Sequence, residues 1–167
     1  VVALNFPVDA ETATALVAHF FEAVAAPAYN PVAREILRTK KRLRVLEVPR
    51  ATWQSGLGVV RELHGAFLVQ DRDHGFDELQ SLEVVTRAQP SPAERDDAAF
   101  LWAVAKHVRS NAIVVGRDRR TLGIGAGQMS RVDSCAIAVD KARSAGHDLV
   151  GSIAASDAFF PFPDGVE

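Results

Sequence analysis

The chain has 167 residues, and its 19 lysines and arginines nearly balance 21 aspartates and glutamates, for a formal net charge of −2. This balance provides no overall field that would attract nucleic acid or an anionic membrane. Apolar runs such as AAFLWAVA are too short to cross a bilayer, and the first residues lack the pattern of a signal peptide. We therefore expect a cytoplasmic protein with no nucleic-acid partner and no membrane partner.

The N-terminal third predicts two helices after a short apolar run at residues 1–4. Asp9 is a suitable N-cap for a helix that ends at Pro27, and Asn30 followed by Pro31 begins a second helix that reaches about Lys40. The first helix is predicted from apolar positions with a period of 3.6, namely Ala13, Leu16, Val17, Phe20, Phe21 and Val24. The basic run RTKKRLR, residues 38–44, is either an anion-binding patch or a complement to the dipole of the second helix.

The middle of the chain predicts strands at residues 43–48 and 65–70, joined by a glycine-containing connection, and a polar loop at 71–79. Residues 86–96 change in composition and hold two prolines, which makes them the best internal boundary. Ser91 and Glu94 form a capping box for a helix that extends to about Val108.

The last third predicts a β-hairpin followed by a strand-loop-helix-strand unit. Its strands are residues 111–116, 121–124 and 149–155, its tight turn is RDRR at 117–120, and a helix over 130–145 is stopped by Gly146. Strands that alternate with helices indicate an α/β fold with helices on the faces of the sheet. Cys135, the single cysteine, excludes an internal disulfide and a multi-cysteine zinc site, and we expect it to be a small core residue.

The glycine loop GIGAGQMSR precedes the last predicted helix. Gly123, Gly125 and Gly127 would let the backbone approach a ligand, and the helix N-terminus offers N–H groups to an anion or a carbonyl. The spacing is neither the dinucleotide fingerprint nor a P-loop. The alternative is that the glycines only allow a tight turn from strand to helix.

Two further features can carry chemistry. The segment ASDAFFPFPDG, residues 155–165, holds phenylalanines that either stack on a flat ring or plug the loop into the core, and its Asp157 and Asp164 can accept from ring N–H groups. Asn111 opens a strand, where its amide can donate to and accept from a substrate amide. His107 falls in a last helical turn, where dipole stabilisation is favoured over general-base catalysis.

Two long motifs give the chain a resemblance to a known family. SNAIVVGRDRRTLGIGAGQMSRVDSCAIAVDKA and SDAFFPFPDGVE resemble the AICAR transformylase region of the bifunctional purine biosynthesis enzymes, which also carry an IMP cyclohydrolase domain. VVALNFPVDAETA, ILRTKKRLRVLEV and LVQDRD are similar to upstream segments of the same family, in the same order. The resemblance covers nearly the whole chain.

This resemblance implies transfer of a formyl group from 10-formyltetrahydrofolate to the 5-amino group of AICAR ribotide. The implied fold is a cytidine-deaminase-like three-layer α/β/α arrangement with mixed sheets and two subdomain parts, without catalytic zinc. Residues 1–88 would end the first transformylase subdomain, and residues 89–167 would form the second. The family also implies a homodimer and a structural potassium ion, with Asp157 as one ligand.

Several site residues follow from the same resemblance. Asn111 would be catalytic, near the reacting amine, and Arg131 would bind the carboxamide side of AICAR. The other substrate contacts would be Gln128, Met129, Ser130 and Phe159, and the folate contacts would be Phe162 and Asp164.

The family's catalytic Lys-His pair lies in an FKH-like motif upstream of these segments, and Lys106 with His107 does not match it. We therefore expect a piece of a longer protein that is inactive alone. The alternatives are a non-catalytic nucleotide-binding module and a dimer-forming α/β module.

Overall fold

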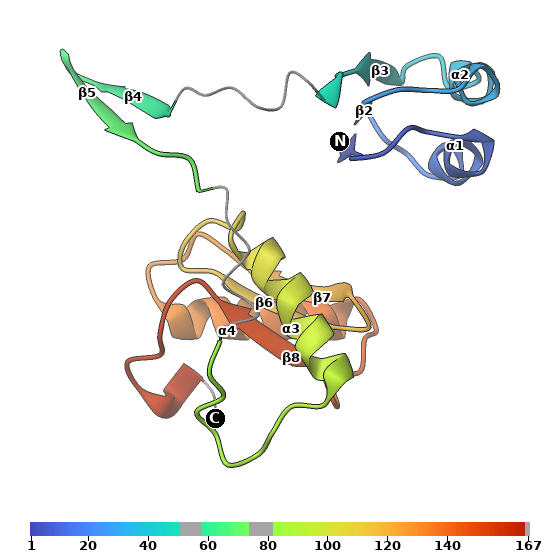
Figure 1. The fold of residues 1–167 in the computed structure, drawn as a ribbon. Helices are drawn as coiled ribbons and strands as arrows, with labels where there is room; N and C mark the ends of the chain where they lie inside the picture. The colour runs from blue at the N-terminus through green and yellow to red at the C-terminus, as the bar shows by residue number, and fades with distance from the viewer. Residues whose placement is uncertain (51–57, 74–81, 166–167) are drawn as a thin grey trace. The chain divides into compact units, whose positions relative to one another are not determined.

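The computed structural model describes residues 1–50, 58–73 and 82–165 and contains two compact units, Val1–Asp73 and His74–Glu167 (Figure 1). The predicted subdomain division at residues 88 and 89 stays a prediction. None of the helices in the described ranges is long and apolar enough to cross a membrane.

The first unit contains a parallel three-stranded sheet in the order β1-β2-β3, formed by Val2–Ala3, Ala23–Ala26 and Arg44–Glu47. Its strands are connected by α1 (Ala10–Val17) and α2 (Pro31–Arg38), which pack against each other. Both predicted caps are confirmed: the side chain of Asp9 accepts from the Thr12 N–H at 2.8 Å, and that of Asn30 from the Ala33 N–H at 2.6 Å. The buried residues of this unit form one core: Val8, Ala13, Val24, Ala26, Tyr29, Ala33 and Leu37.

The first predicted helix is too long. α1 ends at Val17, and Val24 lies in β2, between β1 and β3, with its side chain fully buried. The run Ala-Val-Ala-Ala is apolar throughout, so its periodicity cannot distinguish a buried strand from a buried helix. Pairing with strands on both sides decides in favour of the strand.

The first unit ends in a β-hairpin, of which the sequence predicted only one strand. β5 (Ala66–Gln70) matches the expected strand at 65–70, but its antiparallel partner β4 (Val59–Leu63) falls in the segment expected to be a connection. His64 and Gly65 form the turn with φ of 46° and 88°, the left-handed conformation of tight hairpin turns. Residues 51–57 of the expected connection and 74–79 of the expected loop lie outside the described ranges.

The second unit contains an antiparallel sheet in the order β7-β6-β8, and its predicted elements are confirmed in order. β8 begins four residues later than expected because Gly151, with φ of 72°, lies in a turn before it. The elements of this unit are α3 (Pro92–Ala105), β6 (Ile113–Arg117), β7 (Arg120–Gly125), α4 (Arg131–Ser144), β8 (Ile153–Ser156) and the short 3₁₀ helix η3 (Pro163–Gly165). The Ser91–Glu94 capping box opens α3, and Gly146 follows α4 with φ of 79°.

The second unit has three layers, with α3 and α4 on opposite faces of the sheet (Figure 1). Val114 of β6 packs with Leu101 and Ala105 of α3, whereas its neighbours Ile113 and Val115 pack with Ala138 of α4. This alternation is what a strand buried on both faces requires. The α/β class is confirmed, with parallel and antiparallel pairing in separate sheets, while the cytidine-deaminase-like detail stays a prediction.

The turn of the β6–β7 hairpin is held by a buried carboxylate from α3. Asp118 and Arg119 have φ of 55° and 52°, and their N–H groups donate to Asp97 at 2.9 and 2.7 Å. Asp97 is only 8% exposed, and the Arg119 guanidinium also pairs with the neighbouring Asp96 at 2.7 Å. Asp97 of helix α3 therefore fixes the backbone of the predicted turn between β6 and β7.

Candidate functional site

Two of the three loop glycines serve helix packing. Gly123 and Gly125 belong to β7, and a Cβ built on either would lie 1.9 Å from a carbonyl oxygen of α4, that of Ala138 or of Ser134. At these two positions the glycines allow α4 to pack closely on β7, a role that neither the tight-turn nor the ligand-cradle interpretation included. Gly127, with φ of 68°, is the glycine that lies in the loop itself. The close contact of Gly123 and Gly125 with α4 brings the first turn of that helix against the residues before β6.

Asn111, just before β6, is held through all of its polar groups. Its backbone N–H and its Nδ2 both donate to the Gln128 carbonyl, at 3.1 and 3.0 Å, and its Oδ1 accepts from Arg131 Nη2 at 3.1 Å. Its carbonyl accepts from the Ser134 hydroxyl at 2.8 Å. Because one end of the amide meets an acceptor and the other a donor, these contacts define the amide orientation. Within residues 1–50, 58–73 and 82–165, these bonds leave a second Nδ2 hydrogen and a second Oδ1 lone pair for a ligand.

Arg131 is the first residue of α4, and its side chain is only 11% exposed. Nη1 donates to Asp157 Oδ1 at 2.6 Å and to Ser156 Oγ at 2.7 Å, and the guanidinium lies 5.9 Å from the centre of the Phe160 ring. With the bond to Asn111, three of its five N–H groups have partners within the described part of the chain. The remaining N–H groups can serve a ligand.

Asp157, directly after β8, connects that strand to both Arg131 and the start of β6. Its Oδ1 also accepts from the Ala112 N–H at 3.1 Å, and its own N–H donates to the Ala112 carbonyl at 3.3 Å. Partial burial raises the pKa of this carboxyl, but hydrogen bonds from Arg131, Ser110 and Ala112 outweigh it and bring the pKa to about 2. Asp157 is therefore a carboxylate at any physiological pH.

The expected potassium site at Asp157 stays a prediction. Within the described ranges, no group of three or more histidine, cysteine, aspartate or glutamate side chains is placed to hold a metal ion. Potassium is a hard cation that prefers oxygen ligands, which carbonyl groups can also supply.

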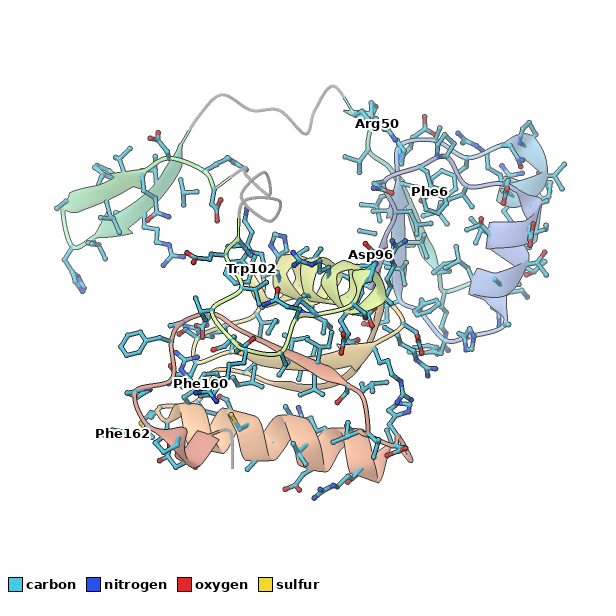
Figure 2. All side chains as sticks on the ribbon, turned by 60° about the horizontal axis from the view of Figure 1, so that its bottom comes forward. Phe6, Arg50, Asp96, Trp102, Phe160 and Phe162 are labelled. Atoms are coloured by element: carbon cyan, nitrogen blue, oxygen red, sulfur yellow. The ribbon has the colours of Figure 1, made fainter. Side chains whose placement is uncertain are left out.

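The phenylalanine loop divides between the core and the surface. Phe160 packs beside Cys135 and Gly165, whereas Phe159 and Phe162 are 79% and 68% exposed. Figure 2 shows Phe160 and Phe162 beside the N-terminal half of α4, which also contacts η3. The core reading therefore holds for Phe160, and the exposed side chains of Phe159 and Phe162 remain available to a ligand.

The other predicted site residues lie at the surface next to this network. Met129 is fully exposed, Asp164 is exposed within η3, and Ser130 is the N-cap of α4 without a side-chain cap bond. Gln128 contributes its carbonyl to Asn111, while its side chain donates to the Ala126 carbonyl at 3.0 Å.

Cys135 behaves as the sequence predicts, since it is half-buried against the core around Ile113 and Phe160. Burial raises the pKa of its thiol, which favours the unreactive protonated form. His107 follows the end of α3, and its N–H donates to the Val104 carbonyl at 3.0 Å. In the described part of the chain, the side chains of Asn111 and Arg131 bond to Gln128, Ser156, Asp157 and each other, and none of these partners is a histidine.

Sequence reasoning missed two serines that complete the network. Ser134 is fully buried and bonds to Asn111, and Ser156 accepts from Arg131. The only signal for Ser134 was its position three residues after Arg131, which places both side chains on one face of the helix. Ser156 was marked only by its place next to Asp157.

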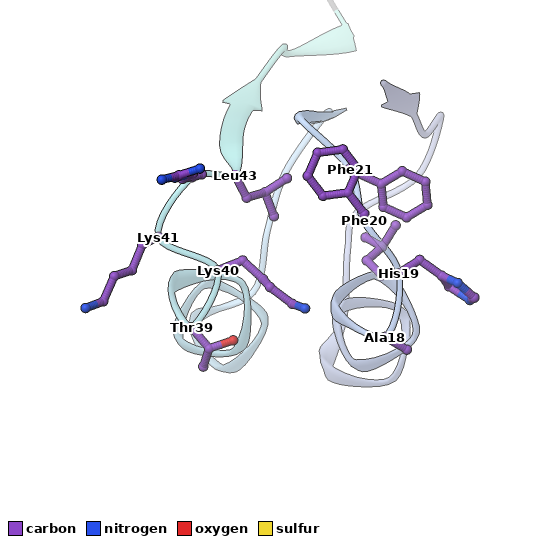
Figure 3. Close-up of a pocket in the computed structure, with 10 residues that line it drawn as sticks. Ala18, His19, Phe20, Phe21, Thr39, Lys40, Lys41 and Leu43 are labelled. Carbon is purple, nitrogen blue, oxygen red and sulfur yellow. The ribbon is translucent and has the colours of Figure 1, made fainter.

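The first unit holds a separate hollow of about 390 Å³, away from this network in sequence (Figure 3). It is lined by Leu16, Ala18, His19, Phe20, Phe21, Thr39, Lys40, Lys41, Arg42 and Leu43. Figure 3 shows Lys40 extending from the end of α2 toward the end of α1, while Lys41 points away. Since both helices present their C-terminal ends, the basic run also complements their dipoles, so both readings of it stay open.

The family of the chain follows from its similarity to known proteins. The model of the AICARFT/IMPCHase bienzyme family matches residues 1–141, which is most of the chain. The chain belongs to this family. Its relatives within the AICARFT/IMPCHase bienzyme family include three proteins each called bifunctional purine biosynthesis protein PurH.

The PurH of Anaeromyxobacter sp. (strain Fw109-5) is 49% identical over all of this chain and 33% of its own length. The PurH of Desulfitobacterium hafniense (strain DSM 10664 / DCB-2) is 44% identical over all of this chain and 32% of its own length. The PurH of Synechococcus elongatus is 49% identical over 99% of this chain and 32% of its own length. The chain thus spans about a third of the length of the curated relatives it matches.

Proposed function

We propose that this chain forms part of an AICAR formyltransferase, which moves a formyl group from 10-formyltetrahydrofolate to AICAR ribotide in purine biosynthesis. The observation that carries the proposal is the network of Asn111, Arg131 and Asp157, in which an oriented amide and a partly satisfied guanidinium lie side by side. The names of the relatives support the pathway, and the two C-terminal motifs support the formyltransfer step.

The reaction forms a C–N bond and breaks another. The AICAR amine attacks the formyl carbon and loses a proton, the bond between that carbon and N10 of the folate breaks, and N10 takes up a proton to release tetrahydrofolate. The free lone pair of Asn111 Oδ1 would accept a hydrogen bond from the AICAR amine. That bond would orient the lone pair of the amine nitrogen toward the formyl carbon. The second Nδ2 hydrogen of Asn111 could serve an oxygen that gains charge.

Arg131 would bind the carboxamide of AICAR through the N–H groups that the protein leaves open. Asp157 and Ser156 hold the guanidinium from the other side, so the side chain loses little freedom when the ligand binds. Gln128, Met129 and Ser130 border this position, and Phe159 would pack on the AICAR ring. Phe162 and Asp164 would contact the pterin of the folate, the ring by packing and the carboxylate by accepting its N–H groups.

The test is a formyl-transfer assay on the complete protein with AICAR ribotide and 10-formyltetrahydrofolate, and with each substrate omitted in turn. We expect turnover only with both substrates. Arg131→Ala should reduce kcat/KM for AICAR by at least about 100-fold, because the AICAR carboxamide loses charged donors and Asp157 loses its ion-pair partner. Absence of turnover in the unaltered protein, or an Arg131→Ala protein with normal kcat/KM, would contradict the proposal.

A further inference from the structure

Ser134 is a buried polar side chain to which neither the family resemblance nor the proposed mechanism gives a role. It lies in the second turn of α4 and has no solvent exposure. A serine inside a helix commonly bonds to the carbonyl four residues before it, but the Ser134 hydroxyl instead donates out of the helix. Its acceptor is the Asn111 carbonyl oxygen, at 2.8 Å.

This bond joins α4 to the segment that precedes β6. A hydroxyl has one hydrogen to donate, and Ser134 gives it to the residue whose amide meets Arg131. The contact depends on the close approach at Gly125, where the Ser134 carbonyl leaves no room for a Cβ. Ser134 therefore contacts β7 through its backbone and the segment before β6 through its hydroxyl.

Asn111 also has a contact from Arg131, which belongs to α4 like Ser134, and contacts from a different element. Its N–H and Nδ2 both bond to the Gln128 carbonyl, which belongs to the loop between β7 and α4. That loop has Gly127 in the left-handed region and an exposed Met129, so it contains few packed side chains. Ser134 provides the contact from a packed, fully buried position.

We propose that Ser134 is a positioning residue for formyl transfer, which sets the main chain of Asn111 so that its amide oxygen faces both Arg131 and the substrate amine. This inference rests on the proposed function. Ser134 does not touch the substrate, so its effect should fall on turnover more than on AICAR binding. A displacement of about 1 Å in a group that orients a reacting atom can cost about 100-fold in rate.

The test compares Ser134→Ala, Ser134→Cys and Ser144→Ala in the complete protein. Ser134→Ala removes the donor to the partly buried Asn111 carbonyl, Ser134→Cys keeps a weak donor, and Ser144 is an exposed serine of the same helix. We expect Ser134→Ala to lower kcat by about 10- to 100-fold with KM for AICAR changed less than about threefold. Ser134→Cys should recover part of kcat, and Ser144→Ala should match the unaltered protein.

Two further readouts separate positioning from stability and from the proposed function. Thermal unfolding identifies the variants that fold. If Ser134→Ala does not fold, Ser134→Cys replaces it in the comparison. The kcat of Ser134→Cys must then fall below that of Ser144→Ala. Hydrogen exchange of the Asn111 N–H should speed up at least about tenfold in Ser134→Ala, whatever the reaction.

Absence of turnover in the unaltered protein would refute the formyltransferase proposal, and exchange would then decide the role of Ser134. Unchanged exchange, or a folded Ser134→Ala protein with kcat within about twofold of the unaltered one, would overturn the inference.

Discussion

At the scale of single residues, the candidate site is a network of hydrogen bonds that joins Asn111, Arg131 and Asp157. Buried polar groups that are fully satisfied fix one arrangement, whereas one missing partner costs desolvation energy without return. Asn111 and Arg131 were expected at the site from the family resemblance. Their direct contact was not predictable, because it joins positions 20 residues apart through the packing of α4 on β7.

The ion pair between Arg131 and Asp157 should stabilise the fold in a pH-dependent way. Because the folded-state pKa of Asp157 is about 2, below the ordinary value near 4, its contribution is complete above about pH 4 and is lost as the pH falls toward 2. Asp157→Asn should lower the free energy of unfolding at pH 7 by roughly 1–3 kcal/mol. Urea unfolding of both proteins at a series of pH values measures this difference.

The matched control is Asp140→Asn, which changes an exposed aspartate of α4 and should leave stability within about 0.5 kcal/mol. The difference in free energy of unfolding between the unaltered protein and Asp157→Asn should decrease from pH 4 downward. A difference that is absent at pH 7, or that stays constant down to pH 2, would show that Arg131 does not hold this carboxylate.

Phe162 is an exposed aromatic residue that the proposal places against the pterin of the folate. Phe162→Ala should raise KM for the formyl donor by about 10-fold or more and leave KM for AICAR within about twofold, because only the pterin loses its packing surface. Stability should hardly change, since the ring is 68% exposed. Steady-state kinetics with each substrate varied checks this, and an unchanged KM for the formyl donor would remove Phe162 from the folate site.

At the scale of elements, helices with clear caps were predictable and a short buried strand was not. Asp9, Asn30 and the Ser91–Glu94 box each satisfy N–H groups by local contacts, so their effect can be read along the sequence. β2 is a run of four small apolar residues whose identity as a strand comes from β1 and β3 on either side of it. Its strand partners are 21 or 22 residues away in sequence, where no periodicity could reveal them.

The glycines of the β7–α4 join give a test at this scale. Gly125→Ala should cost about 3 kcal/mol or more, because its Cβ would collide with the Ser134 carbonyl and separate the helix from the strand. Gly127→Ala should cost only about 1–2 kcal/mol, since its Cβ meets nothing closer than 3.7 Å and only its left-handed φ is unfavourable.

Chemical unfolding of both variants measures the difference. If Gly125→Ala were as stable as the unaltered protein and lost only ligand binding, the glycine would serve as a ligand cradle, contrary to the packing role. Equal losses from the two substitutions would also count against a specific contact between β7 and α4.

At the scale of the whole molecule, composition and charge predicted a protein without a field for nucleic acid, but they did not indicate what it binds. The specific information came from the long C-terminal motifs, which fall on β6, β7, α4 and the loop after β8. These are the elements that hold the network of Asn111, Arg131 and Asp157. The first unit has its own core and its own hollow, and the proposed chemistry uses neither.

The central claim is that the Asn111 amide takes part in formyl transfer, and the most direct measurement is kcat of the complete protein with Asn111→Ala at saturating AICAR ribotide and 10-formyltetrahydrofolate. Asn5→Ala, which removes an exposed amide of the first unit, is the control and should keep normal turnover. We predict that Asn111→Ala lowers kcat by at least about 100-fold while the protein stays folded, because the substitution removes the oxygen that accepts from the amine and the N–H that serves the oxygen gaining charge. A folded Asn111→Ala protein with kcat within about threefold of the unaltered one would contradict the account.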